Sequence, residues 1–157
     1  MAHRKFHSVT VRPVSKAAET GDGDILFNPI KIPGACLRSS SSLLKSVCML
    51  DTDDKLAAVD LYFFQVNKNL GTLGSVISIT DADMLLAQPL GCVTIPAVSG
   101  LGDYVLGGIS TLTDINLVVT SDVDDNDEGA IYVAGVATAT NTYTAGGLRF
   151  TFGFEVL

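Results

Sequence analysis

The chain has 157 residues, a formal net charge of −7, 47% hydrophobic residues and 17% charged residues. This length is typical of a single domain, and the large apolar fraction excludes disorder as the main state. The acidic balance argues against a nucleic-acid partner, because phosphates repel an acidic surface. Two long uncharged stretches, 84–102 and 129–148, are interrupted by prolines and glycines or by threonines, so neither predicts a membrane-spanning helix.

Charge is unevenly distributed along the chain. Residues 1–68 hold 9 Lys and Arg against 7 Asp and Glu, whereas residues 69–157 hold only Arg149 against 10 acidic residues. Such asymmetry is typical of a protein whose two faces or ends meet different partners. A solvated acidic surface explains the same pattern more simply.

The cysteine content indicates a reducing environment. Cys36, Cys48 and Cys92 are odd in number and lack a CxxC spacing, so they predict no disulfide framework. We interpret all three as small buried hydrophobic residues of a protein made in a reducing cytoplasm. The first residues also lack the apolar segment of a signal peptide.

The predicted elements, in chain order, are mostly short strands. An N-terminal strand or arm, 1–18, precedes a single domain, 19–157, which opens with a Gly- and Asp-rich turn. Apolar and β-branched runs predict strands at 25–27, 43–50, 56–66, 91–95, 104–120, 131–137 and 148–156. Because helices long enough for parallel crossovers are lacking, this pattern predicts an all-β fold, an antiparallel sandwich or barrel.

One short helix is predicted near residues 80–88. Thr80 is placed to cap the free amides of the first turn, where Asp81 and Asp83 favour the positive end of the helix dipole. Pro89 ends the helix after about two turns, because it cannot continue the hydrogen-bond pattern.

The last strand shows the clearest alternation in the chain. Every second residue of 148–154 is Leu or Phe, and the residues between them are polar or glycine. In a strand, alternate side chains point to opposite faces. The strand therefore predicts one buried face, made of Leu148, Phe150, Phe152 and Phe154.

No motif predicts catalysis, a nucleotide or a cofactor. The chain has no Walker A, nucleophile-elbow or GxGxxG sequence. His3 and His7 lie four residues apart, which in an extended segment places them about 13 Å apart, too far for one metal ion. We therefore expect no enzymatic activity, no cofactor and no metal site at these histidines.

The acidic loop at 122–129 begins like a calcium-binding loop. Asp122, Asp124 and Asn126 occupy its first three ligand positions. The sixth position, however, is Asp127 rather than Gly, and the twelfth is Val133 rather than Glu. We interpret this segment as a solvated loop, with a cation site completed by a neighbouring chain as the alternative.

From residue 20 onward, the chain resembles a family of small virion proteins of tailed bacteriophages, thought to decorate or cement the capsid. The segments that carry the resemblance are Thr20–Asp22, Leu43–Asp51, Val59–Phe64, Ile79–Asp83, Ala130–Val133, Thr142–Thr144 and Leu148–Phe154. The resemblance implies a β-sandwich of the jelly-roll type, with a structural role on the outside of the capsid. It also implies self-association, as a homodimer or homotrimer, and binding to the major capsid protein. A virion-surface sandwich that binds host-cell carbohydrate is the alternative function.

The N-terminal segment precedes the region of resemblance and predicts an interface. Residues 1–12 carry three basic residues and no acidic one. We expect them to leave the sandwich and pair with a sister subunit or the shell protein, because an exposed strand edge is a template for pairing. The alternative is that they close the chain's own sheet. The candidate interface residues are Arg4, Lys5, Phe6, Val9, Val11 and Arg12.

Overall fold

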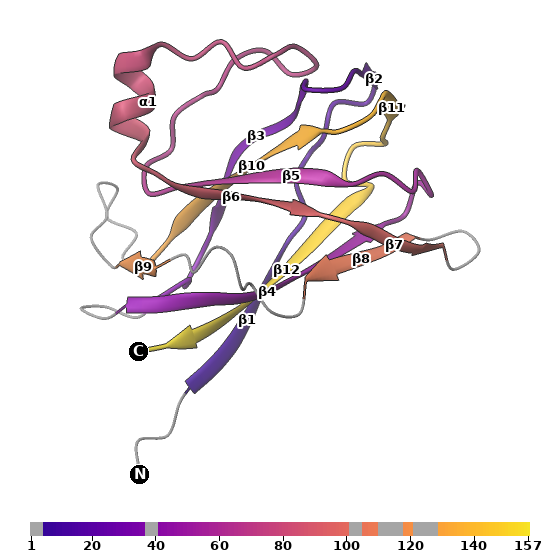
Figure 1. Cartoon of the computed structure of the whole chain (residues 1–157). Helices are drawn as coiled ribbons and strands as arrows, with labels where there is room; N and C mark the ends of the chain where they lie inside the picture. Colours follow the sequence, from indigo (N-terminus) through magenta and orange to yellow (C-terminus); the bar gives the residue numbers. More distant parts are fainter. Residues whose placement is uncertain (1–4, 37–40, 101–104, 110–117, 121–128) are drawn as a thin grey trace.

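The computed structural model describes residues 5–36, 41–100, 105–109, 118–120 and 129–157. Its strands form three antiparallel sheets (Figure 1). The largest sheet contains β1 (Lys5–Val11), β12 (Leu148–Val156), β4 (Ser41–Asp51), β8 (Val105–Ile109) and β7 (Ala97–Gly100), in that order, with β9 (Val118–Thr120) also paired to β4. The second contains β3 (Ile25–Ile32), β10 (Ile131–Ala137), β5 (Val59–Phe64) and β6 (Pro89–Ile95). The third pairs β2 (Glu19–Thr20) with β11 (Asn141–Thr142).

The strand order of the two main sheets is that of a jelly roll. Leaving aside the short strands β2, β7, β9 and β11, eight strands remain, which in chain order are β1, β3, β4, β5, β6, β8, β10 and β12. Counted in that sequence, one sheet has the order first-eighth-third-sixth and the other second-seventh-fourth-fifth. This arrangement of two interleaved Greek keys confirms the predicted all-β antiparallel sandwich and specifies its type. Figure 1 shows the two sheets as layers, with the helix labelled α1 beyond the second sheet.

The main core fills the space between the two sheets. Phe150 and Phe152 of β12 are fully buried, and Phe152 meets Phe63 of β5 edge-on, with ring centroids 5.8 Å apart. Leu148 and Phe154 are buried on the same face, whereas Arg149 is exposed. The alternation predicted for the last strand is therefore confirmed.

A smaller core lies on the other face of the second sheet. It is covered by the segment between β5 and β6, which contains α1 (Asp81–Ala87). The Thr80 Oγ1 accepts a hydrogen bond from the Asp83 amide at 3.1 Å, so the predicted N-cap is confirmed. The helix ends at Gln88, whose left-handed backbone turns the chain into β6. The buried members of this core are Ile25, Phe64, Leu70, Ala87, Tyr132 and Ala134.

The N-terminal strand belongs to the body of the sandwich. β1 pairs with β12 over its whole length, with Val9 opposite Phe152 and Val11 opposite Phe150. Both valines are half-buried and pack against the main core. The expectation that residues 1–12 leave the sandwich is therefore wrong for Lys5–Val11, because their apolar face completes the edge of the chain's own core.

The cysteines are not all buried. Cys36 is 2% exposed, and burial raises the pKa of its thiol. Cys48 and Cys92 are exposed and unpaired, because each occupies an outward-facing position of its strand. The expectation of three buried cysteines is wrong for these two.

Candidate functional site

The outer edge of β1 is open to a partner. Among the described strands β1 pairs only with β12, so its other edge presents backbone groups outward. Phe6 is 66% exposed, and Lys5 is also exposed. A hollow of about 360 Å³ lies beside Phe6 and contains Ser8, Ser46 and Gly153 in its lining. This edge therefore offers an aromatic side chain and a neighbouring cation to another surface.

The single described histidine has a structural role at this edge. The Nε2 atom of His7 lies 2.6 Å from the carbonyl oxygen of Gly34, and its ring stacks on Phe154 with centroids 5.5 Å apart. These contacts tie β1 to the end of β3. Among the described residues, no group of three His, Cys, Asp or Glu side chains is placed to hold a metal ion. His3 and residues 122–128 of the acidic loop lie outside the described residues.

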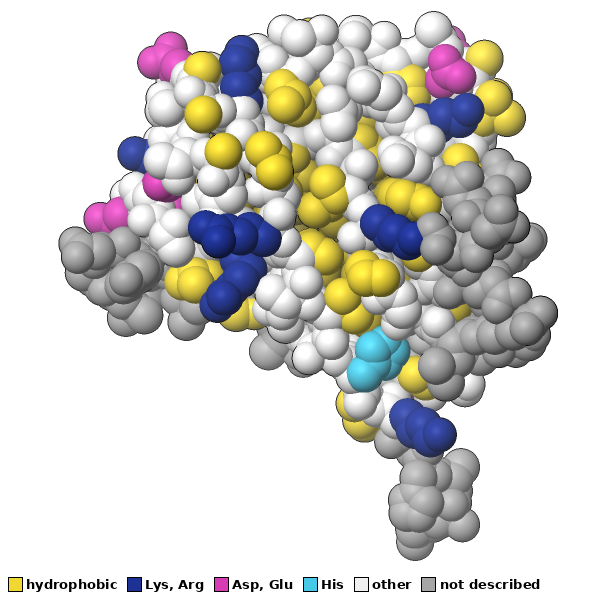
Figure 2. All heavy atoms as spheres, turned by 180° about the vertical axis from the view of Figure 1, so that it is seen from behind, with side chains coloured by type: hydrophobic (Ala, Val, Ile, Leu, Met, Phe, Trp, Pro, Cys, Tyr) yellow, Lys and Arg dark blue, Asp and Glu magenta, His cyan; other side chains and the backbone are white. Residues whose placement is uncertain are grey.

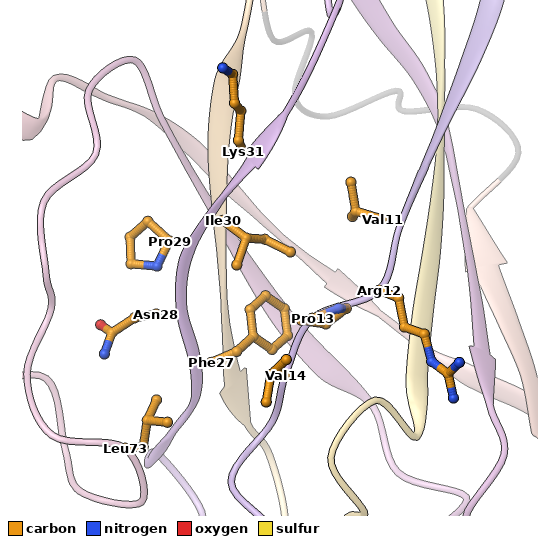
Figure 3. A pocket seen from close by; sticks show the side chains of 10 residues that line it. All are labelled: Val11, Arg12, Pro13, Val14, Phe27, Asn28, Pro29, Ile30, Lys31 and Leu73. Atoms are coloured by element: carbon orange, nitrogen blue, oxygen red, sulfur yellow. The ribbon is translucent and has the colours of Figure 1, made fainter. Parts of the chain in front are cut away.

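A groove of about 470 Å³ runs between the end of β1 and β3, which are edge strands of different sheets. We call it the β1–β3 groove. Its apolar lining comes from both edges and from the loop after β5, and Figure 3 shows Val14, Phe27 and Ile30 gathered at its centre. Val14 is 71% exposed. Arg12 and Lys31 lie at its margins, so this apolar surface is flanked by positive charge.

A second, smaller hollow adjoins the groove at Arg12. It measures about 180 Å³ and is lined by Arg12, Arg149, Thr52 and two loop glycines. The Nε of Arg12 donates to the carbonyl oxygen of Gly146 at 2.6 Å, which holds its guanidinium between the two hollows. We call this second space the arginine hollow. In Figure 2, the rear face of the molecule shows Lys and Arg around exposed apolar side chains, with Asp and Glu toward its margins.

Two carboxylates near this hollow serve the fold. Asp51 is fully buried and accepts the amides of Asp53 and Lys55 at 2.8 and 2.9 Å. Asp53 in turn accepts the amide and hydroxyl of Thr144. Burial raises the pKa of Asp51, and burial with the two nearby carboxylates also raises the pKa of Tyr143. These hydrogen bonds fix the turn after β4 and the loop before β12, which supply Thr52, Gly146 and Gly147 to the lining of the arginine hollow.

The six predicted interface residues do not all lie on one surface. Lys5, Phe6 and Arg12 are exposed, whereas Val9 and Val11 face inward. Arg4 lies outside the described residues.

Sequence analysis missed the other wall of the groove, formed by Phe27, Ile30 and Lys31 of β3. One signal for it was present, since Pro13 follows β1 and Pro29 lies within β3. Proline lacks an amide hydrogen and is therefore confined to the edges of sheets. These two prolines mark two edges that lie side by side.

No protein-family model and no curated protein sequence matches the chain. Solved structures with partial likeness include those of three viruses. The tomato aspermy virus structure has a TM-score of 0.42 and 13% identity, and the alignment covers 99% of this chain and 78% of the viral one. Desmodium yellow mottle tymovirus has a TM-score of 0.33 and 12% identity, and the alignment covers 99% of this chain and 82% of the viral one. A virus-like particle of Macrobrachium rosenbergii nodavirus has a TM-score of 0.29 and 11% identity, with 99% of this chain and 92% of the viral one covered. These scores place the chain in no family, and the fold assignment rests on its own strand order. Within the described residues, no helix has the length and hydrophobicity to cross a membrane.

Proposed function

We propose that the protein is a structural component of a virion, and more specifically a cement protein on the outer surface of a phage capsid. In this role it binds major capsid protein subunits and stabilises the shell by bridging them. It is made in the host cytoplasm and acts without a cofactor. The jelly roll is used by viral capsid proteins, lectins and cupins, so the fold alone does not select among these roles.

The observation that carries the proposal is the open edge of β1. The unpaired edge of β1, with Phe6 at 66% exposure, is a template for a further strand, because its outward backbone groups have no partner among the described strands. Addition of a strand from a shell subunit would satisfy the outward backbone groups. Each contact needs only modest affinity, since many identical sites on a closed shell act together.

Binding to emptied, undecorated capsids tests the proposal. We expect the purified protein to sediment with them at a fixed, saturable ratio to the shell subunits. Phe6→Glu should lower this occupancy at least tenfold, because it places a charge at the edge. Leu56→Glu is the matched control: Leu56 is 59% exposed in the loop after β4, and its replacement should leave occupancy unchanged. Absence of capsid binding by the unaltered protein, with glycan binding in its place, would reject the cement role in favour of the carbohydrate-binding one.

A further inference from the structure

The outer helix carries a surface that complements the β1–β3 groove. Leu85 and Leu86 of α1 are 79% and 57% exposed, so the helix carries two adjacent apolar side chains on its outside. Asp81 is also exposed and lies four residues before Leu85. Side chains at this spacing share one helix face and lie about 5–6 Å apart. The helix therefore presents an apolar side chain with a carboxylate one turn away.

The groove offers the opposite pattern. Its centre is apolar at Val14, Phe27 and Ile30, and its margins carry Arg12 and Lys31. The adjoining arginine hollow adds Arg149 next to Arg12. An occupant that fits this surface has an apolar side chain for the groove and a carboxylate for the arginines.

We propose that the β1–β3 groove binds α1 of a second copy of this chain. Leu85 packs on Val14 and Ile30, above the buried ring of Phe27, and Asp81 faces the Arg12 side. The proposal deepens the proposed function, because it names the contact through which subunits meet on the shell.

The two surfaces of this contact are different, so the interface is of the head-to-tail kind. The groove lies at the edges of β1 and β3, whereas α1 covers the outer face of the second sheet. A head-to-tail contact leaves each copy with one free groove and one free helix, and repeated use closes a ring or continues into a larger array. Because opposite charges flank the apolar contact, we also expect association to weaken as the salt concentration rises.

Two variants of the full chain test the contact. Val14→Glu places a carboxylate in the groove, and Leu85→Glu places one on the helix. Both residues are largely exposed, so thermal melting should remain that of the unaltered protein. Sedimentation equilibrium should show association of the unaltered protein and at least a tenfold weakening for either variant. Leu56→Glu, which adds the same charge elsewhere, should associate normally. Failure of the unaltered protein to associate, or normal association of both variants, overturns the proposal.

Mixing the two variants gives the sharper result. Val14→Glu retains an intact helix, and Leu85→Glu retains an intact groove, so an equimolar mixture should form a one-to-one complex that grows no further. A mixture that stays monomeric overturns the head-to-tail pairing. Capsid binding is measured separately. If the mixed variants form the complex but the protein does not bind capsids, the contact is supported and the cement role is rejected. If the protein binds capsids but the mixed variants stay monomeric, the cement role is supported and the contact is rejected.

Discussion

The two main sheets differ in what lies on their outer faces. The β3-β10-β5-β6 sheet is covered outside by α1 and its flanking loops, which bury Phe64 and Tyr132. We call it the covered sheet. The β1-β12-β4-β8-β7 sheet, which we call the open sheet, carries Thr10 and Cys48 exposed on β1 and β4. Among the described residues this outer face is exposed at small side chains that are compatible with water, and Phe6 on the same face of β1 is its exposed aromatic residue.

Because of this difference, the two sheets contribute to the stability of the fold through different contacts. The covered sheet contributes to two cores, since β10 is buried at every position. Within the described part of the chain the open sheet contributes to the main core, and its outward side chains make local contacts such as the 2.9 Å hydrogen bond between the hydroxyls of Thr10 and Thr151. We therefore expect the loss in the free energy of unfolding to be largest for substitutions between the sheets. It should decrease beneath α1, then at the β1 edge, and be smallest on the open face.

The largest effect is expected between the sheets. Phe152→Ala should lower the free energy of unfolding by about 3–5 kcal/mol, because Phe152 is fully buried against Phe63 and Phe150. Denaturant titration measures the change. Thr151→Ala, the neighbour that faces outward, is the control and should cost about 1 kcal/mol or less, because it removes only the exposed hydrogen bond to Thr10. Equal effects at the two positions would contradict the assignment of inner and outer faces.

A smaller effect is expected beneath α1. Leu70→Ala should cost about 2–3 kcal/mol, at the lower part of the usual range because a small peripheral cluster relaxes around the cavity. Leu86→Ala, on the exposed side of the same helix, should leave the denaturation midpoint nearly unchanged. If Leu70→Ala were as mild as Leu86→Ala, the cover would not be a stabilising part of the fold.

The same contrast explains what could be predicted from the sequence. Over 148–154 of β12 the buried and outward positions alternate, so the period-two pattern revealed both the strand and its buried face. In β10, Ile131–Ala137, all seven positions are buried, so the sequence predicted a strand but no face. The cover over that strand was not predictable, because the segment 67–79 has no regular periodicity. Its burial depends on contacts between residues far apart in the chain.

The candidate site was predicted only in part, for a related reason. Arg12 and Phe6 stand out as a basic and an aromatic residue in an extended segment, and both are exposed. Val9 has the same pattern whether its strand closes its own sheet or pairs with another chain, and only the pairing with β12 decides between them. The far wall of the groove comes from β3, and no local pattern links β3 to β1.

At the β1 edge, the predicted effect is smaller again. Val9→Ala should cost about 1 kcal/mol, because Val9 is half-buried and burial of a whole Val side chain is worth roughly 1.5–3 kcal/mol. Thr10→Ala provides the outward control on the same strand. A variant at Val9 with unchanged stability but impaired capsid binding would restore the interpretation of this segment as a free arm.

On the open face, the expected change in stability is below about 0.5 kcal/mol. Cys48→Ser fits this prediction, because Cys48 is exposed and makes no disulfide. Thiol labelling of the native protein tests the placement directly: Cys48 and Cys92 should react, and Cys36 should react only after unfolding. Mass spectrometry of the labelled peptides identifies each site. Reaction of Cys36 at the same rate as Cys48 would contradict its burial.

The smallest change in thermal stability is expected from the removal of divalent cations. The calcium-like pattern that starts at Asp122 requires a ligand at its twelfth position, which is Val133. Val133 is an apolar residue of β10, fully buried in the main core, so it supplies no carboxylate and cannot turn toward the loop without opening the sandwich. We therefore expect the same melting temperature in EDTA and in millimolar calcium, with magnesium at equal ionic strength as the control. A calcium-specific rise of several degrees would contradict this prediction, because a ligand that binds only the folded state raises its stability.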